Sequence, residues 1–265
     1  MFKHIAKYIL RPDYRKFVTE NQELKRVSKL PRFTPGVANL LDHQIFFSDS
    51  ASFVFMYNEI FRKGIYNFKS SIQEPLIIDA GANIGIGAIY FKKKFAQARV
   101  IAFEPDKKVA EVLRKNIATF QLDQVEVIEK GLWTQEGVLE FQSDGADAGR
   151  IADATNNTNT ITINTTKLSN YLDQPVDLLK IDIEGAEVEV LKECKNQLRN
   201  VRNIFVEYHS MVNQPQQLNE LLEILRNAGF RYYIDNTSFL AEQPLMHLRT
   251  EFGMDLQLNV FGLKE

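Results

Sequence analysis

Short apolar runs alternate with longer segments of helical apolar spacing from residue 76 to the end of the chain. The runs are too short for buried helices, so they predict buried strands. The expected strands are 76–78, 99–103, 125–129, 176–182, 203–209, 230–234 and 256–263. Strand–helix alternation is typical of a mostly parallel sheet with helices on both faces. We therefore predict an α/β, Rossmann-like domain with a seven-stranded sheet in which one strand is antiparallel.

Two regions fall outside this alternation. Residues 1–70 carry no strand–helix repeat, and we expect a helical N-terminal extension or lid before a main domain at 71–265. Residues 134–165 predict a β-hairpin insertion, with strands at 138–141 and 160–163. The polar loop between these strands is long for a compact domain, and we expect it to lie over the active site.

The N-terminal region has amphipathic patterns of its own. Residues 2–17 mix apolar and basic positions, which predicts a helix that packs on the main domain or mediates self-association; binding to a membrane surface is the alternative. Residues 48–61 place aromatic side chains at helical spacing, either as core or as a cover for a pocket. Residues 65–68 then predict a short strand or an extended arm.

Composition limits the partners and the compartment. A net charge of −2 offers no general attraction to nucleic acid. The single cysteine, Cys194, excludes an internal disulfide, and we expect it to be a core or half-buried thiol. There is no apolar run of about 18 residues and no secretory signal, so we expect a cytoplasmic protein without a transmembrane segment.

The first strand leads into a glycine-rich turn and a helix start. Asp79, Gly81, Asn83 and Gly85 form the pattern D-x-G-x-N-x-G. Glycines allow positive φ and close approach of a ligand to the backbone. The dinucleotide pattern G-x-G-x-x-G and the Gly-Lys-Ser/Thr of phosphate loops are both absent. The pattern is typical of S-adenosylmethionine (SAM) methyltransferases, although a tight turn in any α/β protein is the alternative.

Two further strand ends extend the expected cofactor site. Glu104 follows the second strand, 19 residues beyond Gly85, at the spacing of a carboxylate that binds ribose hydroxyls. Gly131, Leu132 and Trp133 follow the third strand and are candidate adenine contacts; for Trp133 a core or rim role is the alternative.

Titratable residues gather on the fourth and fifth strands. Alternation places Lys180 and Asp182 on one face, and Glu207 and His209 on one face of the next strand. We expect Lys180 to pair with Glu207, and Asp182 to lie near His209. A buried lysine needs such a partner, so a structural ion pair is the alternative to catalysis for Lys180 and Glu207.

The chain resembles the FkbM-type SAM-dependent methyltransferases. The matching motifs are IIDAGANIG (77–85), IAFEP (101–105), LLKIDIEGAE (178–187) and FVEYHS (205–210). The resemblance implies that SAM is held by the glycine-rich turn and Glu104. It also implies that the segment from Asp182 through Glu184 to Glu187 borders the transferred methyl group. It implies O-methylation of a small-molecule or glycan acceptor, because the family chiefly methylates hydroxyls of sugars, surface glycans and polyketides.

The chemistry of such a transfer suggests roles for these residues. The acceptor alcohol must lose a proton, and His209 has the pKa range of a base, with Asp182 to orient it or to replace it. A divalent metal on Asp182, Glu184 or His209 is chemically possible, but the sequence has no decisive ligand pattern. The alternatives are a SAM-dependent N- or RNA methyltransferase and, less favoured by the motifs, a nicotinamide-dependent oxidoreductase.

Overall fold

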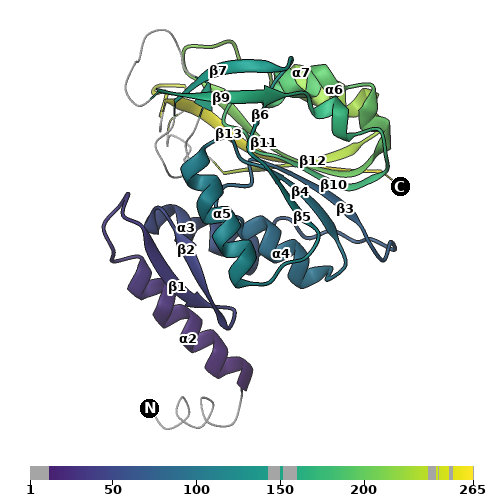
Figure 1. Cartoon of the computed structure of the whole chain (residues 1–265). Helices are drawn as coiled ribbons and strands as arrows, with labels where there is room; N and C mark the ends of the chain where they lie inside the picture. The colour runs from purple at the N-terminus through teal and green to yellow at the C-terminus, as the bar shows by residue number, and fades with distance from the viewer. Residues whose placement is uncertain are drawn as a thin grey trace.

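The computed structural model describes residues 12–142, 150–151, 160–237, 243, 245–250 and 253–264 (Figure 1). A seven-stranded sheet has the order β12-β13-β11-β10-β3-β4-β5. Its strands are β3 (Leu76–Ala80), β4 (Arg99–Phe103), β5 (Val125–Ile128), β10 (Val176–Ile181), β11 (Val201–Met211), β12 (Arg231–Asn236) and β13 (Met254–Leu263). Strand β13 is antiparallel to both of its neighbours, and the pairs β11–β10–β3–β4–β5 are parallel. The predicted α/β fold is confirmed.

Helices cover both faces of this sheet (Figure 1). One face is covered by α4 (Ile86–Lys94) and α5 (Lys107–Thr119), and the other by α6 (Glu187–Cys194) and α7 (Leu218–Asn227). Short 3-10 helices occupy Leu168–Tyr171 and Gln197–Asn200. Cys194 is a buried free thiol, as expected. Within the described residues, no helix combines the length and the apolar character needed to cross a bilayer.

The insertion after β5 forms a second, four-stranded sheet in the order β6-β9-β7-β8. Its strands are β6 (Gly131–Leu132), β7 (Gly137–Gln142), β8 (Arg150–Ile151) and β9 (Thr160–Thr166). Strands β7 and β9 are antiparallel, which confirms the predicted hairpin. Most of the connecting loop, for which a position over the active site was predicted, lies outside the described residues.

The N-terminal region is only partly helical, which corrects the prediction. After α2 (Pro12–Val27) comes a hairpin of β1 (Gly36–Leu40) and β2 (His43–Phe47). Its two turn residues, Leu41 and Asp42, have φ of 57° and 66°, the backbone of a tight hairpin turn that glycine or asparagine usually marks. The sequence lacks that mark. Most of the helix predicted at 2–17 lies outside the described residues, and 65–68 form no strand.

The expected aromatic helix is present as α3 (Ser50–Tyr57), which continues into one turn of π-helix, η1 (Asn58–Lys63). Its side chains share one hydrophobic core with the α4 and α5 face of the main sheet. Asn116 of α5 links the hairpin to the main domain. Its side chain accepts a hydrogen bond from Phe46 N–H and donates to the carbonyls of Phe46 and Ile84. The N-terminal region is therefore part of the packing that supports the glycine-rich turn.

Candidate active site

A row of polar side chains replaces the apolar pattern at the carboxyl ends of the central strands. Strand register places Lys180 opposite Asp79, Glu207 opposite Asn259, and His209 opposite Gln257. Directly paired residues point to the same face of a sheet. Lower on that face the same strands carry apolar residues that belong to the core, namely Ile77, Leu178 and Phe205. The switch from apolar to polar marks the edge at which ligands bind in this class of sheet.

A cavity of about 700 Å³ opens over this edge. Side chains of α3, η1 and Tyr66 line it on the N-terminal side, and residues of β13 line it on the other. Tyr66 is buried and packs edge-on against Phe205, with ring centroids 4.9 Å apart. Nine sequence-predicted site residues line this one cavity together with Gly131 and Leu132. They are Asp79, Gly81, Asn83, Glu104, Lys180, Asp182, Glu184, Glu207 and His209.

The glycine-rich turn after β3 has no room for side chains at its first glycine. Gly81 has φ of +83°, and a Cβ there would lie 1.8 Å from the backbone oxygen of Asp182. Gly85 is the N-cap of α4, where a Cβ would meet Leu113 at 2.4 Å, so its role is helix packing. It is not one of the cavity-lining residues. The first turn of α4 has no side-chain cap, and its residues Ile86 and Gly87 line the cavity.

Glu104 follows β4 and bonds to the glycine-rich turn after β3. Its carboxylate accepts hydrogen bonds from the N–H groups of Asn83 (3.0 Å) and Asp106 (2.9 Å). Asn83 reaches this position with φ of 48°, in the left-handed region that asparagine tolerates. Burial raises the pKa of Glu104 to about 7, although both N–H groups favour the ionised form. Each carboxylate oxygen retains acceptor capacity for a ligand hydroxyl.

The third strand end places its three candidates differently. Gly131 and Leu132 line the cavity. Trp133 is half-buried, packs against the core on the α6 and α7 side, and donates its backbone N–H to Thr166 O. Of these three candidates, it is the one that does not contribute to the cavity wall.

The predicted Lys180–Glu207 ion pair is wrong. Lys180 Nζ lies 3.3 Å from Asp79 Oδ1 and 3.4 Å from Asp182 Oδ2. It also donates hydrogen bonds to the carbonyls of Ala80 and Gly81. The prediction considered only the strand on one side of β10. Register places the apolar Phe205 beside Lys180 on β11, whereas Asp79 is its direct neighbour on β3.

His209 lies close to Asp182, as predicted, but another residue orients its ring. Nδ1 is 3.0 Å from Oε1 of Glu187, the first residue of α6, and that oxygen also accepts the N–H groups of Ile183 and Gly185. A carboxylate can only accept, so Nδ1 carries a proton. Nε2 then faces Glu184 at 3.7 Å and Glu207 at 3.9 Å. The expected orientation by Asp182 is corrected to orientation by Glu187.

Buried carboxylates dominate the electrostatics of this end of the cavity. Burial by itself lowers the pKa of His209, but Glu187 and Glu184 outweigh it and hold the pKa well above its usual value. Burial raises the pKa of Glu184, and Asp182 and Glu207 add to that shift. Burial also raises the pKa of Glu207 to about 7. The carboxyl groups beside His209 therefore favour its protonated form and disfavour the ionised forms of one another.

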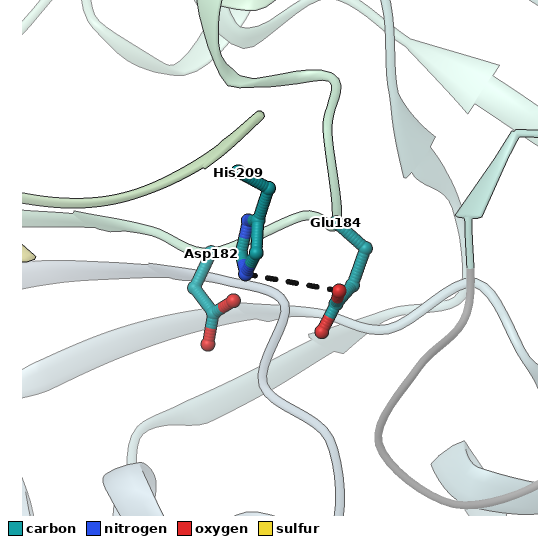
Figure 2. A group of neighbouring side chains, drawn as sticks. All are labelled: Asp182, Glu184 and His209. Atoms are coloured by element: carbon teal, nitrogen blue, oxygen red, sulfur yellow. Dashed lines mark ion pairs between the residues drawn. The ribbon is translucent and has the colours of Figure 1, made fainter. Parts of the chain in front are cut away.

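Asp182, Glu184 and His209 converge on one point (Figure 2). The His209 ring lies between the two carboxylates, and one ligand atom from each residue lies within 4.8 Å of the others. Glu184 takes part because the turn before α6 bends sharply, with φ of +56° at Glu184 and +101° at Gly185. Such left-handed backbone at a non-glycine residue is uncommon and often marks a functional site.

The sequence prediction missed several residues of this site. Glu187 was included only in a segment implied by family resemblance, and its bond to His209 arises from tertiary contact between α6 and β11. Gln257 and Asn259 line the cavity from β13, where their alternation with apolar neighbours was visible in the sequence. Gln257 donates a hydrogen bond to Glu207. Only the pairing of β13 with β11 shows that these amides face the carboxylates.

Residues 79–232 match the methyltransferase FkbM domain, which covers more than half of the chain and all of the polar row except its β13 members. The chain belongs to the FkbM methyltransferase family. It is therefore a SAM-dependent methyltransferase, and the alternative of a nicotinamide-dependent oxidoreductase is removed.

Similar proteins with assigned functions come from fungi, bacteria and archaea. Methyltransferase sdnD of Sordaria araneosa is 30% identical over 226 residues, which cover 71% of this chain and 86% of that protein. The 2-O-methyltransferase NoeI of Sinorhizobium fredii is 26% identical over 156 residues, which cover 51% of this chain and 63% of that protein. The hexuronic acid methyltransferase AglP of Haloferax volcanii is 32% identical over 57% of this chain and 62% of that protein.

A solved structure supports the fold. The FkbM methyltransferase from Methylobacillus flagellatus aligns with a TM-score of 0.51 over 94% of this chain and 59% of that chain. Sequence identity is 13%, so this similarity bears on the fold alone.

Proposed function

We propose that this chain transfers the methyl group of SAM to a hydroxyl oxygen of a sugar-like acceptor. The observation that carries this proposal is one cavity that joins the glycine-rich turn to a group of buried hydrogen-bond acceptors. Acceptors of this kind suit a ligand that presents several hydroxyl donors. The names of two relatives, a 2-O-methyltransferase and a hexuronic acid methyltransferase, support the same chemistry.

The residues around the turn fit SAM. Glu104 has spare acceptor capacity for ribose hydroxyls, and the missing side chain at Gly81 lets the turn pack directly against the backbone of Asp182. The uncapped start of α4, at Ile86 and Gly87, suits the carboxylate of the methionine part. Asp79 is buried, and neither of its oxygens accepts a hydrogen bond from a described residue, although Lys180 neutralises it. Gly131 and Leu132 would border the adenine. Bound SAM supplies an electrophilic methyl group on a sulfonium sulfur.

The protein's own contribution is alignment of the acceptor and removal of its proton. The side chain of His209 is 1% exposed, whereas those of Asp182 and Glu207 are 24% and 14% exposed. An acceptor in the cavity therefore meets the two carboxylates before the imidazole. We assign proton removal to Asp182 or Glu207, and to His209 the positioning of its neighbours. Holding two reactants in line provides much of the rate enhancement in such displacements.

The test is a methyl-transfer assay with matched acceptors. Purified protein and SAM are incubated with methyl glycosides of hexoses and hexuronic acids, and with their amino-sugar counterparts. Mass spectrometry then locates the added methyl group. Methyl groups on hydroxyl oxygens in both sets support the proposal. Methylation only at amines, or only of added RNA, contradicts it and favours the alternative SAM-dependent activities.

Variants separate the proton acceptors from the cofactor site. Asp182→Asn or Glu207→Gln is expected to lower kcat by about 10²–10⁴-fold, the usual contribution of a general base. Affinity for S-adenosylhomocysteine, the demethylated product, should change little. Glu126→Gln, at an exposed position of β5, is the matched control and should keep its kcat. Unchanged kcat in both cavity variants would refute this assignment.

A further inference from the structure

We propose that Asp182, Glu184 and His209 form a binding site for a divalent cation at the acceptor end of the cavity. The role of this ion in catalysis rests on the proposed function, but its binding does not. The three residues come from three segments: the end of β10, the turn before α6, and β11. Folding therefore brings together ligands that lie 27 residues apart at the extremes (209 − 182).

The spacing of the three side chains suits an ion. Their ligand atoms lie within 4.8 Å of one another. Ligands that share an ion at about 2.2 Å must lie within about 4.4 Å of each other, twice that distance. Small side-chain rotations close the difference. Two carboxylates with one imidazole suit Mn²⁺ or a related divalent metal, and three protein ligands leave open positions for water or an acceptor oxygen.

His209 is held as a metal-ligating histidine is held. Its Nδ1–H donates to Glu187, a buried carboxylate outside the three ligands, and this fixes the ring with Nε2 toward Glu184. A carboxylate on the far nitrogen is the usual support of a histidine ligand, because it sets the tautomer and the ring orientation. Ligation needs the neutral imidazole, so the ion takes the place of a proton on Nε2.

An independent observation lies on β13. Asn259 is 3% exposed, lines the same cavity, and stands opposite Glu207 in the sheet. Its side-chain oxygen has no hydrogen-bond partner among the described residues. A buried acceptor without a donor is costly, and a water molecule carried by an ion would supply that donor.

The carboxyl groups around the three ligands also favour a bound cation. Among the described residues, five carboxyl groups lie within 4 Å of either Lys180 Nζ or a ring nitrogen of His209. The five are Asp79, Asp182, Glu184, Glu187 and Glu207. Lys180 forms ion pairs with Asp79 and with Oδ2 of Asp182. We therefore assign the other oxygen of Asp182, Oδ1, as the atom that binds the cation. A divalent cation would offset the excess.

In the reaction, the ion would hold the acceptor hydroxyl and lower its pKa, as bound metal ions do for water. The O–H bond would then break with transfer of the proton to Glu207, a cavity carboxylate outside the three ligands whose Oε1 lies 3.9 Å from His209 Nε2. This divides the work between a binding site that orients the oxygen and a base that receives its proton.

The test is Mn²⁺ binding by the full chain, without SAM or acceptor. Chelator-treated protein is titrated with Mn²⁺, and the electron paramagnetic resonance signal of the free ion is followed. We expect one ion per chain. Asp182→Asn and Glu184→Gln should each weaken binding at least tenfold, and Glu187→Gln by about 10–100-fold through the loss of ring support. Glu189→Gln, which removes an exposed carboxylate of α6, is the matched control and should bind as the parent does.

Each outcome decides the proposal. Loss of affinity only in the site variants, with cooperative unfolding retained, supports it. Glu184 lies in a turn with a partly exposed side chain, so its variant stays informative if a variant at His209 fails to fold. No Mn²⁺ binding, or equal affinity in the parent and in Glu184→Gln, overturns it.

The two proposals fail in different ways. Mn²⁺ binding at this site without methylation of any hydroxyl would refute the proposed function and leave the site standing. Hydroxyl methylation at the full rate in chelator, by protein that binds no Mn²⁺, would do the reverse.

Discussion

Lys180 lines the cavity and connects two of the segments that form the site. It is 3% exposed, and burial alone would lower its pKa, but Asp182 and Asp79 outweigh burial and raise it. The ammonium also donates to Gly81 O and Ala80 O, so it fixes the glycine-rich turn to the end of β10. We interpret it as a positioning residue that joins the cofactor end of the cavity to the acceptor end.

Lys180→Met is therefore expected to destabilise the protein by about 3 kcal/mol, because it leaves the Asp79 carboxylate buried without its partner. Urea unfolding measures the loss. Lys192→Met is the control: Lys192 is 36% exposed and pairs with Glu189 and Glu220, so its removal should cost less than about 1 kcal/mol. Equal losses in the two variants would contradict a special role for Lys180.

Glu104 makes a prediction about pH. Its pKa in the folded protein, about 7, lies above the ordinary value of 4.5. The protonated form is favoured on folding, so its contribution to stability is full below about pH 4.5 and is lost as the pH rises through 7. Ligand binding has the opposite sign, since a carboxylate accepts ribose hydroxyls more strongly than a carboxylic acid does.

Affinity for S-adenosylhomocysteine should therefore rise several-fold between about pH 6 and about pH 8. Isothermal titration calorimetry measures it. Glu104→Gln should bind more weakly and lose this part of the pH dependence, and any titration of the ligand itself appears equally in both proteins. The same pH slope in parent and variant would show that Glu104 does not meet the ligand.

At the scale of elements, the site depends on two sharp turns that meet. The turn after β3 and the segment after β10 touch where Gly81 packs on the backbone of Asp182, and Asp182 N–H donates to Ala80 O. This contact places the proposed cofactor loop directly beside Asp182, the first residue of the proposed acceptor site. A side chain at Gly81 would separate them.

Gly81→Ala should accordingly reduce both stability and affinity for S-adenosylhomocysteine. Gly229→Ala is a matched control, because Gly229 has φ of +87° but a Cβ there meets nothing within 4 Å. The control should lose only the stability that a side chain costs in left-handed backbone, about 1–2 kcal/mol of the free energy of unfolding. Gly81→Ala should lose about 1–3 kcal/mol more through overlap, with at least tenfold weaker binding. Thermal unfolding and calorimetry compare them; equal effects would contradict the packing argument.

At the scale of the whole molecule, the N-terminal region completes the core instead of standing apart. Phe47, Phe53 and Tyr57 pack in the same cluster as Ile89 and Phe91 of α4. The row of polar side chains lies on that same face of the sheet, so the N-terminal region also covers the site. We retain 1–70 and 71–265 as a proposed division by sequence, with a shared core between them.

A chain that begins at residue 64 is expected to lose cooperative unfolding, because the apolar face under α3 would meet water. Near-ultraviolet circular dichroism and urea unfolding report the change. A truncated chain that unfolds cooperatively and binds S-adenosylhomocysteine as the full chain does would instead show that the N-terminal region is a separable lid.

The sequence by itself determined the strands of the main sheet and the strand ends that line the cavity. Apolar runs, the first glycine of the turn and the carboxylate after the second strand are local signals: the runs form strands, and Gly81 and Glu104 line the cavity. The β1–β2 hairpin was missed because Leu41 and Asp42 adopt a turn that their residue types do not announce.

Tertiary structure decided which charges meet. Lys180 belongs to β10, which lies between β3 and β11. Only the strand register shows that its neighbours are Asp79 on β3 and Phe205 on β11. Glu187 reaches His209 across the packing of α6 on β11, and Asn259 reaches the cavity through an antiparallel strand from the end of the chain. Local patterns specify what each strand end offers. The partners follow from strand order and register, which depend on the packing of the whole chain.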